Sequence, residues 1–182
     1  MFLPPLVGPA KSRNGENMKL TRLDIIVPLL AALSCLLMIP EIPVWALFIG
    51  WAWYYSMGKN LKVFSQATPP LMAGSLMAVL HFILYDGLAV IMPALAATMT
   101  GVFITVFLLL MIQKIPAFSP TLPGFNAYSC IFIGYEAGTY LNVPGLPPLF
   151  NAWLWIAGAN FIGLLFGWAS IELEKRTAGR AA

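Results

Sequence analysis

The sequence predicts an all-α polytopic membrane protein, a bundle of six transmembrane helices, and three observations lead to this fold class. Hydrophobic residues make up 60% of the chain and charged residues 9%, against about 45–50% and about 25% in soluble proteins. Charge-free apolar runs recur along the chain and are separated by short charged or Pro-rich connections. The basic residues fall only in alternate connections, as the positive-inside rule requires of a multi-pass protein.

Charges delimit the expected helices, because an ionised group at mid-bilayer costs about 3 kcal/mol or more. The charge-free runs are, in order, Ile25–Pro40, Ile42–Gly58, Val63–Tyr85, Gly87–Gln113, Ile115–Tyr135 and Ala137–Ile171. The last run is too long for one span and is interrupted by prolines, so we expect its helix to begin near Leu149. The first two runs are short for a hydrocarbon core of about 30 Å, which leaves a re-entrant hairpin as an alternative to full spanning.

The connections on one side of these helices hold every Lys and Arg of the chain. The ten basic residues are Lys11, Arg13, Lys19, Arg22, Lys59, Lys62, Lys114, Lys175, Arg176 and Arg180. The connections on the other side carry Glu41 and Asp86. The expected organisation is therefore a cytoplasmic N-terminal tail over residues 1–22, a six-helix transmembrane domain over 23–171 and a cytoplasmic C-terminal tail over 172–182.

A weak internal recurrence predicts two inverted three-helix repeats. A Phe-Ile-Gly-aromatic motif occupies residues 48–51 and again 132–135, and a Pro-Pro-Leu triplet opens both the third and the sixth helix. Three crossings per copy place the second copy upside down, an arrangement common in transport proteins, whose site lies at the repeat interface. The alternative is a chance recurrence, because these residue types are common in membrane helices.

Glu136 is the one acid inside an apolar segment. Lipid cannot solvate an ionised carboxylate, so we expect the side chain to face the bundle interior or a subunit interface. There it would carry protons or bind a cationic or amide substrate, with Tyr135 as a neighbouring donor. The alternative is a carboxyl at the outer membrane interface, within reach of water.

The remaining polar candidates are few. His81, the only histidine, is either a pH-sensing or proton-relay group near Tyr85 and Asp86 or a hydrogen-bonded packing residue. Asn151 and Asn160 lie on roughly opposite faces of the sixth helix, so only one of them is expected to line a common pathway. Small residues that favour close helix packing, within or between subunits, are Gly50, Gly134, Gly138, Gly163 and Gly167.

Enzymatic and metal-binding constellations are not apparent. The two cysteines, Cys35 and Cys130, lie in apolar runs without a second ligand at metal-binding spacing. A Ser/His/Asp set in hydrophilic loops, a Gly-rich phosphate loop and HExxH or CxxC motifs are likewise missing. We therefore expect no enzymatic activity, no cofactor and no metal site, and the net charge of +3 reflects membrane topology rather than nucleic-acid binding.

Four short motifs stand out in the apolar part of the chain: Pro43–Ala52, Gln113–Pro116, Pro123–Phe125 and Phe132–Gly134. They resemble motifs of small bacterial inner-membrane proteins classed as domain of unknown function 1097, or YcdZ-like proteins, and the likeness covers roughly residues 18–169. The resemblance implies a multi-pass protein of the bacterial inner (plasma) membrane without an established activity. Glu136 and the N-terminal tail depart from the family pattern, and no catalytic residue can be carried over.

The expected function follows from how little of the chain lies outside the membrane. Such a protein acts through its intramembrane surface, which favours a channel or facilitator for a small uncharged or weakly charged solute. We expect it to be a homo-oligomer in the lipid bilayer. The alternative is a structural or accessory subunit of a larger membrane complex, with its helices packed against another chain.

Overall fold

The computed structural model describes residues 20–179, and within them the fold is all-α. Six α-helices follow one another, with a short 3₁₀ helix after the first and another after the fourth. Their bounds are α1 Leu23–Ser34, η1 Cys35–Met38, α2 Val44–Ser56, α3 Lys62–Leu88, α4 Ala94–Ile112, η2 Pro116–Phe118, α5 Thr121–Glu136 and α6 Pro148–Gly179. The prediction of an all-α chain with six helices is confirmed.

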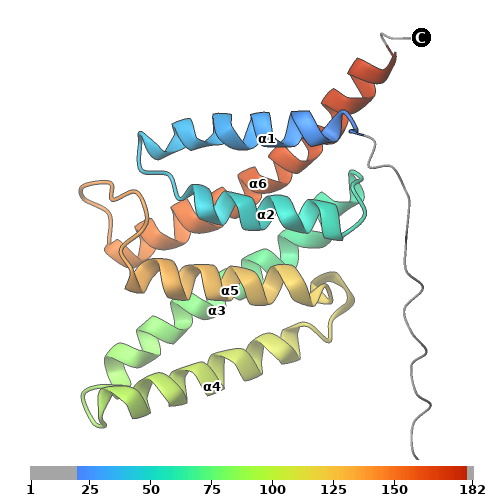
Figure 1. Cartoon of the computed structure of the whole chain (residues 1–182). Coiled ribbons are helices and arrows are strands. Elements are labelled where there is room, and N and C mark those ends of the chain that lie inside the picture. Colours follow the sequence, from blue (N-terminus) through green and yellow to red (C-terminus); the bar gives the residue numbers. More distant parts are fainter. Residues whose placement is uncertain (1–19, 180–182) are drawn as a thin grey trace, which may run out of the picture.

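The helices form two layers (Figure 1). Helices α1, α2, α5 and α4 lie side by side in this order, and α6 and α3 run obliquely behind them. The most extensive packing joins α2 to α6 and α5 to α3, while α4 packs on α3. Helices α1 and α4 therefore lie at the two edges of the bundle, where each leaves an apolar face uncovered by the chain.

Close approach of the paired helices depends on glycine. A Cβ atom added to Gly50 would overlap the backbone carbonyl oxygen of Asn160, and one added to Gly74 would overlap that of Gly124. Because only glycine lets two helix backbones meet in this way, α2 touches α6 and α3 touches α5 backbone to backbone. Dispersion contacts along these seams replace the hydrophobic effect, which is weak between helices in lipid.

Prolines and one carboxylate set most of the helix beginnings. Pro43, Pro93 and Pro120 immediately precede α2, α4 and α5, and Pro148 is the first residue of α6, where a missing N–H costs nothing. At the start of α1, the Asp24 carboxylate accepts hydrogen bonds from the backbone N–H and the hydroxyl of Thr21, at 2.6 and 2.7 Å. The sixth helix thus begins one residue before the predicted Leu149.

Helices α3 and α4 have boundaries that differ from the sequence prediction. Helix α3 begins at Lys62, so the triplet 69–71 lies inside it rather than opening it, and this part of the repeat argument is wrong. Pro69 and Pro70 deprive the carbonyl groups of Ser65 and Gln66 of helical donors, but both residues are exposed near the helix end, where water can reach them. Helix α3 also continues to Leu88, and Pro93 delays the start of α4 to Ala94.

Three of the helices are long and apolar enough to cross a membrane by themselves. They are α3 with 27 residues, α4 with 19 residues, and α6, in which the apolar stretch lies within 148–178. Helices α1, α2 and α5 have 12, 13 and 16 residues, and 13 helical residues reach only about 20 Å. The protein is therefore a multi-pass membrane protein, and full crossing by the three short helices stays a prediction.

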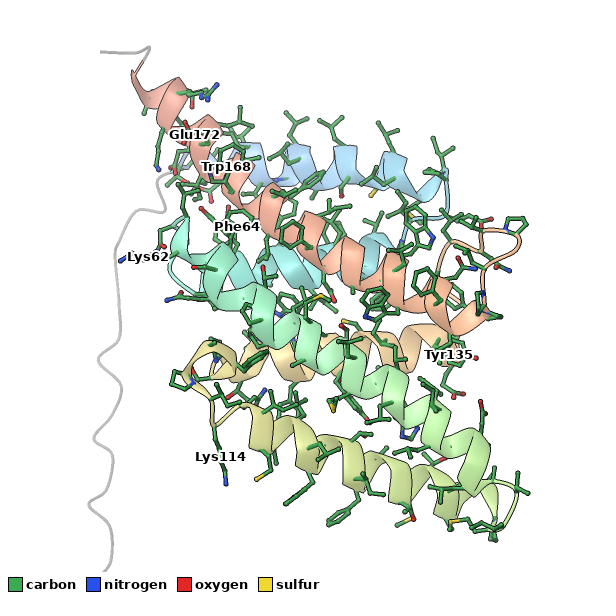
Figure 2. All side chains as sticks on the ribbon, turned by 180° about the vertical axis from the view of Figure 1, so that it is seen from behind. Lys62, Phe64, Lys114, Tyr135, Trp168 and Glu172 are labelled. Atoms are coloured by element: carbon green, nitrogen blue, oxygen red, sulfur yellow. The ribbon has the colours of Figure 1, made fainter. Side chains whose placement is uncertain are left out.

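Charged residues separate towards the two ends of the bundle. Figure 2 shows Lys62, Lys114 and Glu172 at one end, here called the basic end, and Tyr135 at the other. At the opposite end, here called the acidic end, Glu41 lies in the η1–α2 connection and Asp86 lies in the last turn of α3. Helix α6 projects from the basic end beyond the predicted limit of 171. Of the basic residues, Lys11, Arg13, Lys19 and Arg180 lie outside the described part of the chain.

Candidate functional site

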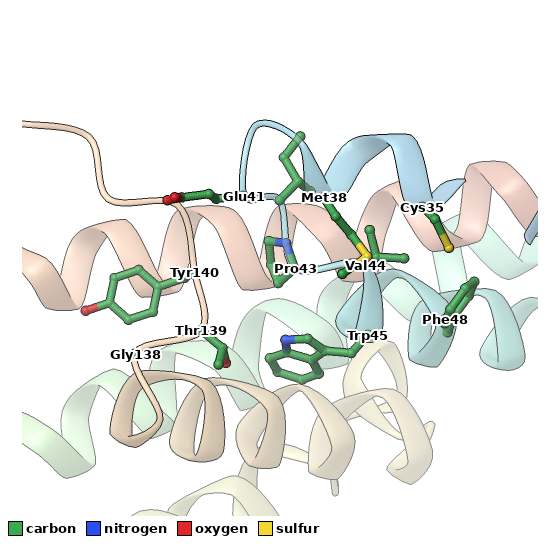
Figure 3. A pocket seen from close by; sticks show the side chains of 11 residues that line it. Cys35, Met38, Glu41, Pro43, Val44, Trp45, Phe48, Gly138, Thr139 and Tyr140 are labelled. Atoms are coloured by element: carbon green, nitrogen blue, oxygen red, sulfur yellow. The ribbon is translucent and has the colours of Figure 1, made fainter. Parts of the chain in front are cut away.

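A hollow of about 610 Å³ opens at the acidic end, between the η1–α2 connection and the segment after α5. Figure 3 shows the side chains of Glu41, Trp45, Phe48, Thr139 and Tyr140 around it. The lining combines aromatic rings with one carboxylate and the hydroxyl groups of Thr139 and Tyr140, so it can accept a small neutral or weakly cationic molecule. We call it the outer hollow.

The backbone on both sides of the outer hollow adopts the left-handed conformation. Glu41 has φ +61°, and Gly138 on the facing segment has φ +63°. A non-glycine residue with positive φ is uncommon and strained, and such residues concentrate at binding sites and switch regions. Pro40 and Pro43 on either side of Glu41 restrict the alternatives open to this turn.

The inner wall of the hollow leads towards the middle of the bundle. The indole of Trp45 and the side chain of Ile156 meet over Gly134, where an added Cβ would lie 2.9 Å from Cζ2 of Trp45. One turn further along α6 and α5 lie Asn160 and Cys130, both buried. Trp45 and Ile156 therefore separate the outer hollow from a buried polar group.

Asn160 holds three helices together. Its Nδ2 donates to the carbonyl oxygen of Ala46 on α2 at 2.7 Å and lies 3.7 Å from the Cys130 sulfur on α5. Its Oδ1 is buried and has no hydrogen-bond partner among the described residues. A buried hydrogen-bond acceptor without a donor costs about 1–3 kcal/mol of stability. This oxygen could therefore accept a hydrogen bond from a polar solute near the centre of the bundle.

A second polar cluster lies between α3, α4 and α5. The hydroxyl groups of Thr105 and Tyr128 are 2.9 Å apart, and Thr105 also donates to the carbonyl oxygen of Gly101 at 2.8 Å. His81 is buried beside them, with its ring centre 4.9 Å from that of Phe132 and its Nδ1 directed at Gly101. The rings of Phe82 and Phe132 and the backbone at Gly101 lie against this histidine. Asp86 is exposed and forms no hydrogen bond with it among the described residues.

The other predicted residues lie apart from one another. Asn151 is buried at the start of α6 and donates to Asn142 Oδ1 at 3.0 Å and to the Val143 carbonyl oxygen at 3.2 Å, which fastens the α5–α6 connection. Tyr135 lies against Phe82, with ring centres 4.5 Å apart, and stacks on Tyr140 at the outer hollow.

Glu136 does not face the interior of the chain, and the prediction of an interior position is wrong. It is the last residue of α5 and is exposed. The physical reason is the early end of the helix: the N–H of Thr139 bonds back to the carbonyl oxygen of Gly134, which turns the chain out at the acidic end. A place for Glu136 at a subunit interface stays a prediction.

The predicted packing glycines divide into two kinds. Gly50 meets the backbone of Asn160, Gly163 meets the Leu47 carbonyl, and Gly167 meets the Tyr54 ring, so these three serve the α2–α6 seam within one chain. Gly138 has no atom within 4 Å of an added Cβ and does not pack against another helix; its positive φ ends α5 instead.

The outer hollow was not predicted from the sequence, because its lining comes from segments about 100 residues apart. The available signal was the Pro-Glu-Ile-Pro turn at 40–43, in which a charged residue is confined between two prolines. Within residues 20–179, the structure places no three His, Cys, Asp or Glu residues together in a way that could hold a metal ion.

The fold and the site define a helical multi-pass membrane protein with an aromatic, weakly acidic hollow at one end. Its sequence matches the family model described as "Protein of unknown function (DUF1097)" over residues 24–175, and the chain belongs to this family. No curated protein and no solved structure matches the chain. The resemblance inferred from the sequence motifs is confirmed.

Proposed function

We propose that this protein is a channel or facilitator for a small uncharged or weakly charged solute, and that the outer hollow is its entrance. The observation that carries the proposal is the outer hollow, with Trp45 in its lining and a buried polar group on the inner side of Trp45. The outer hollow of about 610 Å³ comes first, the Trp45–Ile156 contact over Gly134 follows, and the unpaired buried oxygen of Asn160 lies behind it. Trp45 would act as the gate between them.

In this proposal all six helices cross the bacterial inner membrane, with the basic end and both termini in the cytoplasm. The separation of Lys62 and Lys114 from Glu41 and Asp86 supports that orientation. The short helices α2 and α5 would be completed by their connections, and association into a homo-oligomer would cover the apolar edges on α1 and α4.

The packing pattern supports inverted repeats in part. If α1–α3 and α4–α6 are two copies of one repeat, α2 corresponds to α5 and α6 corresponds to α3. The α2–α6 pair is then equivalent to the α5–α3 pair, and these are the two most extensive pairs in the bundle. The predicted equivalence of Gly50 and Gly134 has less support, because Gly50 meets a backbone whereas Gly134 meets the side chains of Trp45 and Ile156.

Flux through purified protein in liposomes tests the proposal. Stopped-flow light scattering with urea, glycerol and larger polyols should give faster solute entry than empty liposomes, with a cut-off in solute size. Trp45→Ala should raise the rate and shift the cut-off to larger solutes. Phe103→Ala is the matched control, because this aromatic side chain is 73% exposed on the outer face of α4 and should leave flux unchanged.

Cys130 supplies an independent reporter of the same gate. In a Cys35→Ser background, Cys130 is buried behind Trp45 and should react slowly with a thiol reagent added from the acidic end. Trp45→Ala should speed that reaction, and Phe103→Ala should not. Equal labelling rates in all variants would argue against Trp45 as a gate.

The alternative function, an accessory subunit of a larger membrane complex, is favoured by the apolar edge of α4. Leu95, Met99 and Phe103 are 72%, 64% and 73% exposed along one stripe of this helix. Such a stripe suits another protein chain as well as lipid. Liposomes that show no solute flux above background for the wild type and for Trp45→Ala would support this alternative over the facilitator.

A further inference from the structure

The basic end of the bundle contains a pocket that the proposed transport function does not use. It has a volume of about 540 Å³ and lies where the α2–α3 connection meets α6. Lys59, Lys62 and Lys175 line it, together with Glu172 and Trp168. Figure 2 shows Lys62, Trp168 and Glu172 at this same end of the molecule.

The positive charge of this pocket is not neutralised within the described part of the chain. Its one carboxylate, Glu172, pairs with Arg176 at 3.3 Å, and none of the three lysines forms an ion pair among residues 20–179. The Lys59 ammonium lies 4.8 Å from the centre of the Tyr55 ring. Three like charges around one hollow repel one another, and a bound anion would relieve that repulsion.

A braced turn positions the backbone of Lys59 and Lys62. Lys59 has φ +57° and follows Gly58 at φ +111°, so the chain reverses sharply here. The Asn60 side chain braces the turn, since its Nδ2 donates to the Gly58 carbonyl oxygen at 3.2 Å and its Oδ1 accepts from the Lys62 N–H at 2.9 Å. A non-glycine residue in this left-handed conformation is uncommon and strained, which is typical of a pre-organised binding loop.

An apolar groove adjoins the basic pocket through Lys59. This second hollow, of about 660 Å³, lies between α1 and α2, and Lys59 is part of its lining as well. Its other walls include Val27, Ala31, Trp51 and Tyr55, and it is open towards the outside of the bundle. A molecule with an anionic head at the lysines and a hydrocarbon chain in the groove matches both chemistries at once.

We propose that this combined site binds an anionic phospholipid, with the headgroup phosphate at Lys59, Lys62 and Lys175 and one acyl chain along the α1–α2 groove. Basic pockets between membrane helices are suited to such headgroups. The lipid would fasten α1, an edge helix, to the rest of the bundle. A soluble phosphate compound would satisfy the lysines but leave the groove empty.

Native mass spectrometry of the full-length protein in detergent, with lipids added in equal amounts, tests the proposal. Phosphatidylglycerol and cardiolipin should be retained, and phosphatidylcholine should be retained much less. Lys59→Gln, Lys62→Gln and Lys175→Gln should each weaken retention about fivefold, the factor expected for losing one surface lysine. Lys114→Gln is the matched control, because this lysine lies at the basic end but outside the pocket.

The groove has its own test. Ala31→Phe should fill the space between α1 and α2 and weaken retention of the lipid while leaving the lysines intact. Glycerol 3-phosphate, added as a headgroup without chains, should compete poorly. Equal retention of phosphatidylcholine, an effect of Lys114→Gln as large as that of Lys59→Gln, or full competition by glycerol 3-phosphate would overturn the proposal. Circular dichroism of each variant confirms that the compared proteins are folded.

Discussion

Glycine residues allow the closest contacts between helices in this protein. Gly50 is the clearest, because its Cα region touches the Asn160 backbone and leaves no room for a methyl group. The Asn160 side chain reinforces the same seam by donating to Ala46 at 2.7 Å. This contact and this hydrogen bond lie one turn apart on α2, and Gly163 and Gly167 continue the same seam further along α6.

Gly50→Ala should destabilise the protein by about 1–3 kcal/mol or more, because the new methyl group forces the backbones of α2 and α6 apart. Thermal unfolding in detergent, followed by circular dichroism, measures the effect. Gly158→Ala is the matched control, since an added Cβ at that position meets no atom within 4 Å. A similar loss in both variants would show that the close contact at Gly50 is unimportant.

Glu136→Gln distinguishes a carboxyl group that takes part in transport from one that is solvated at the membrane interface. The side chain is exposed at the end of α5, so removing its charge should leave the unfolding temperature unchanged. If Glu136 carries protons or binds the solute, the amide should alter solute flux or its pH dependence in liposomes. Unchanged flux between pH 5 and 8 would identify it as a solvated interface residue.

At the scale of helices, termination matters as much as packing. Helix α5 ends because Gly138 takes a positive φ and Thr139 bonds back to Gly134, and this turn brings Thr139 and Tyr140 to the outer hollow. A helix continued past this point would carry the same residues away from Trp45. The helix end therefore helps to form the candidate entrance.

Gly138→Ala should cost about 1–2 kcal/mol, because alanine in the left-handed region places its Cβ too close to the following carbonyl oxygen. Gly138→Asn should recover part of the loss, since asparagine tolerates this conformation. Gly87→Ala is the control, because Gly87 has neither a positive φ nor a neighbour within 4 Å of an added Cβ. Equal melting temperatures for Gly138→Ala and Gly87→Ala would contradict the strain argument.

At the scale of the whole molecule, charge separation along the bundle predicts its orientation. Single cysteines introduced into a background free of Cys35 and Cys130 report on which side of the membrane each connection lies. Asn60→Cys should react only with reagent that reaches the cytoplasm, and Val90→Cys, in a connection at the acidic end where Val90 is 82% exposed, only with reagent outside the cell. Labelling of position 60 from outside would refute the six-crossing topology.

The sequence alone determined the membrane class, the number of helices and the alternation of charge between connections. These properties depend on local composition, on prolines at helix ends and on the cost of burying charge, all of which can be read in short windows. It could not determine that α3 begins before its prolines, because the exposure of the freed carbonyl groups decides whether a helix survives there.

Only the tertiary structure decided which helices pair and where the hollows lie. Asn160 and Ala46 meet across 114 residues of sequence, and the outer hollow joins residues 35–48 to residues 138–140. Close approach of this kind depends on the fit of glycines, backbones and aromatic rings on opposing helices. Apolar residues of similar hydrophobicity look alike in the sequence, and only their three-dimensional shape selects a partner.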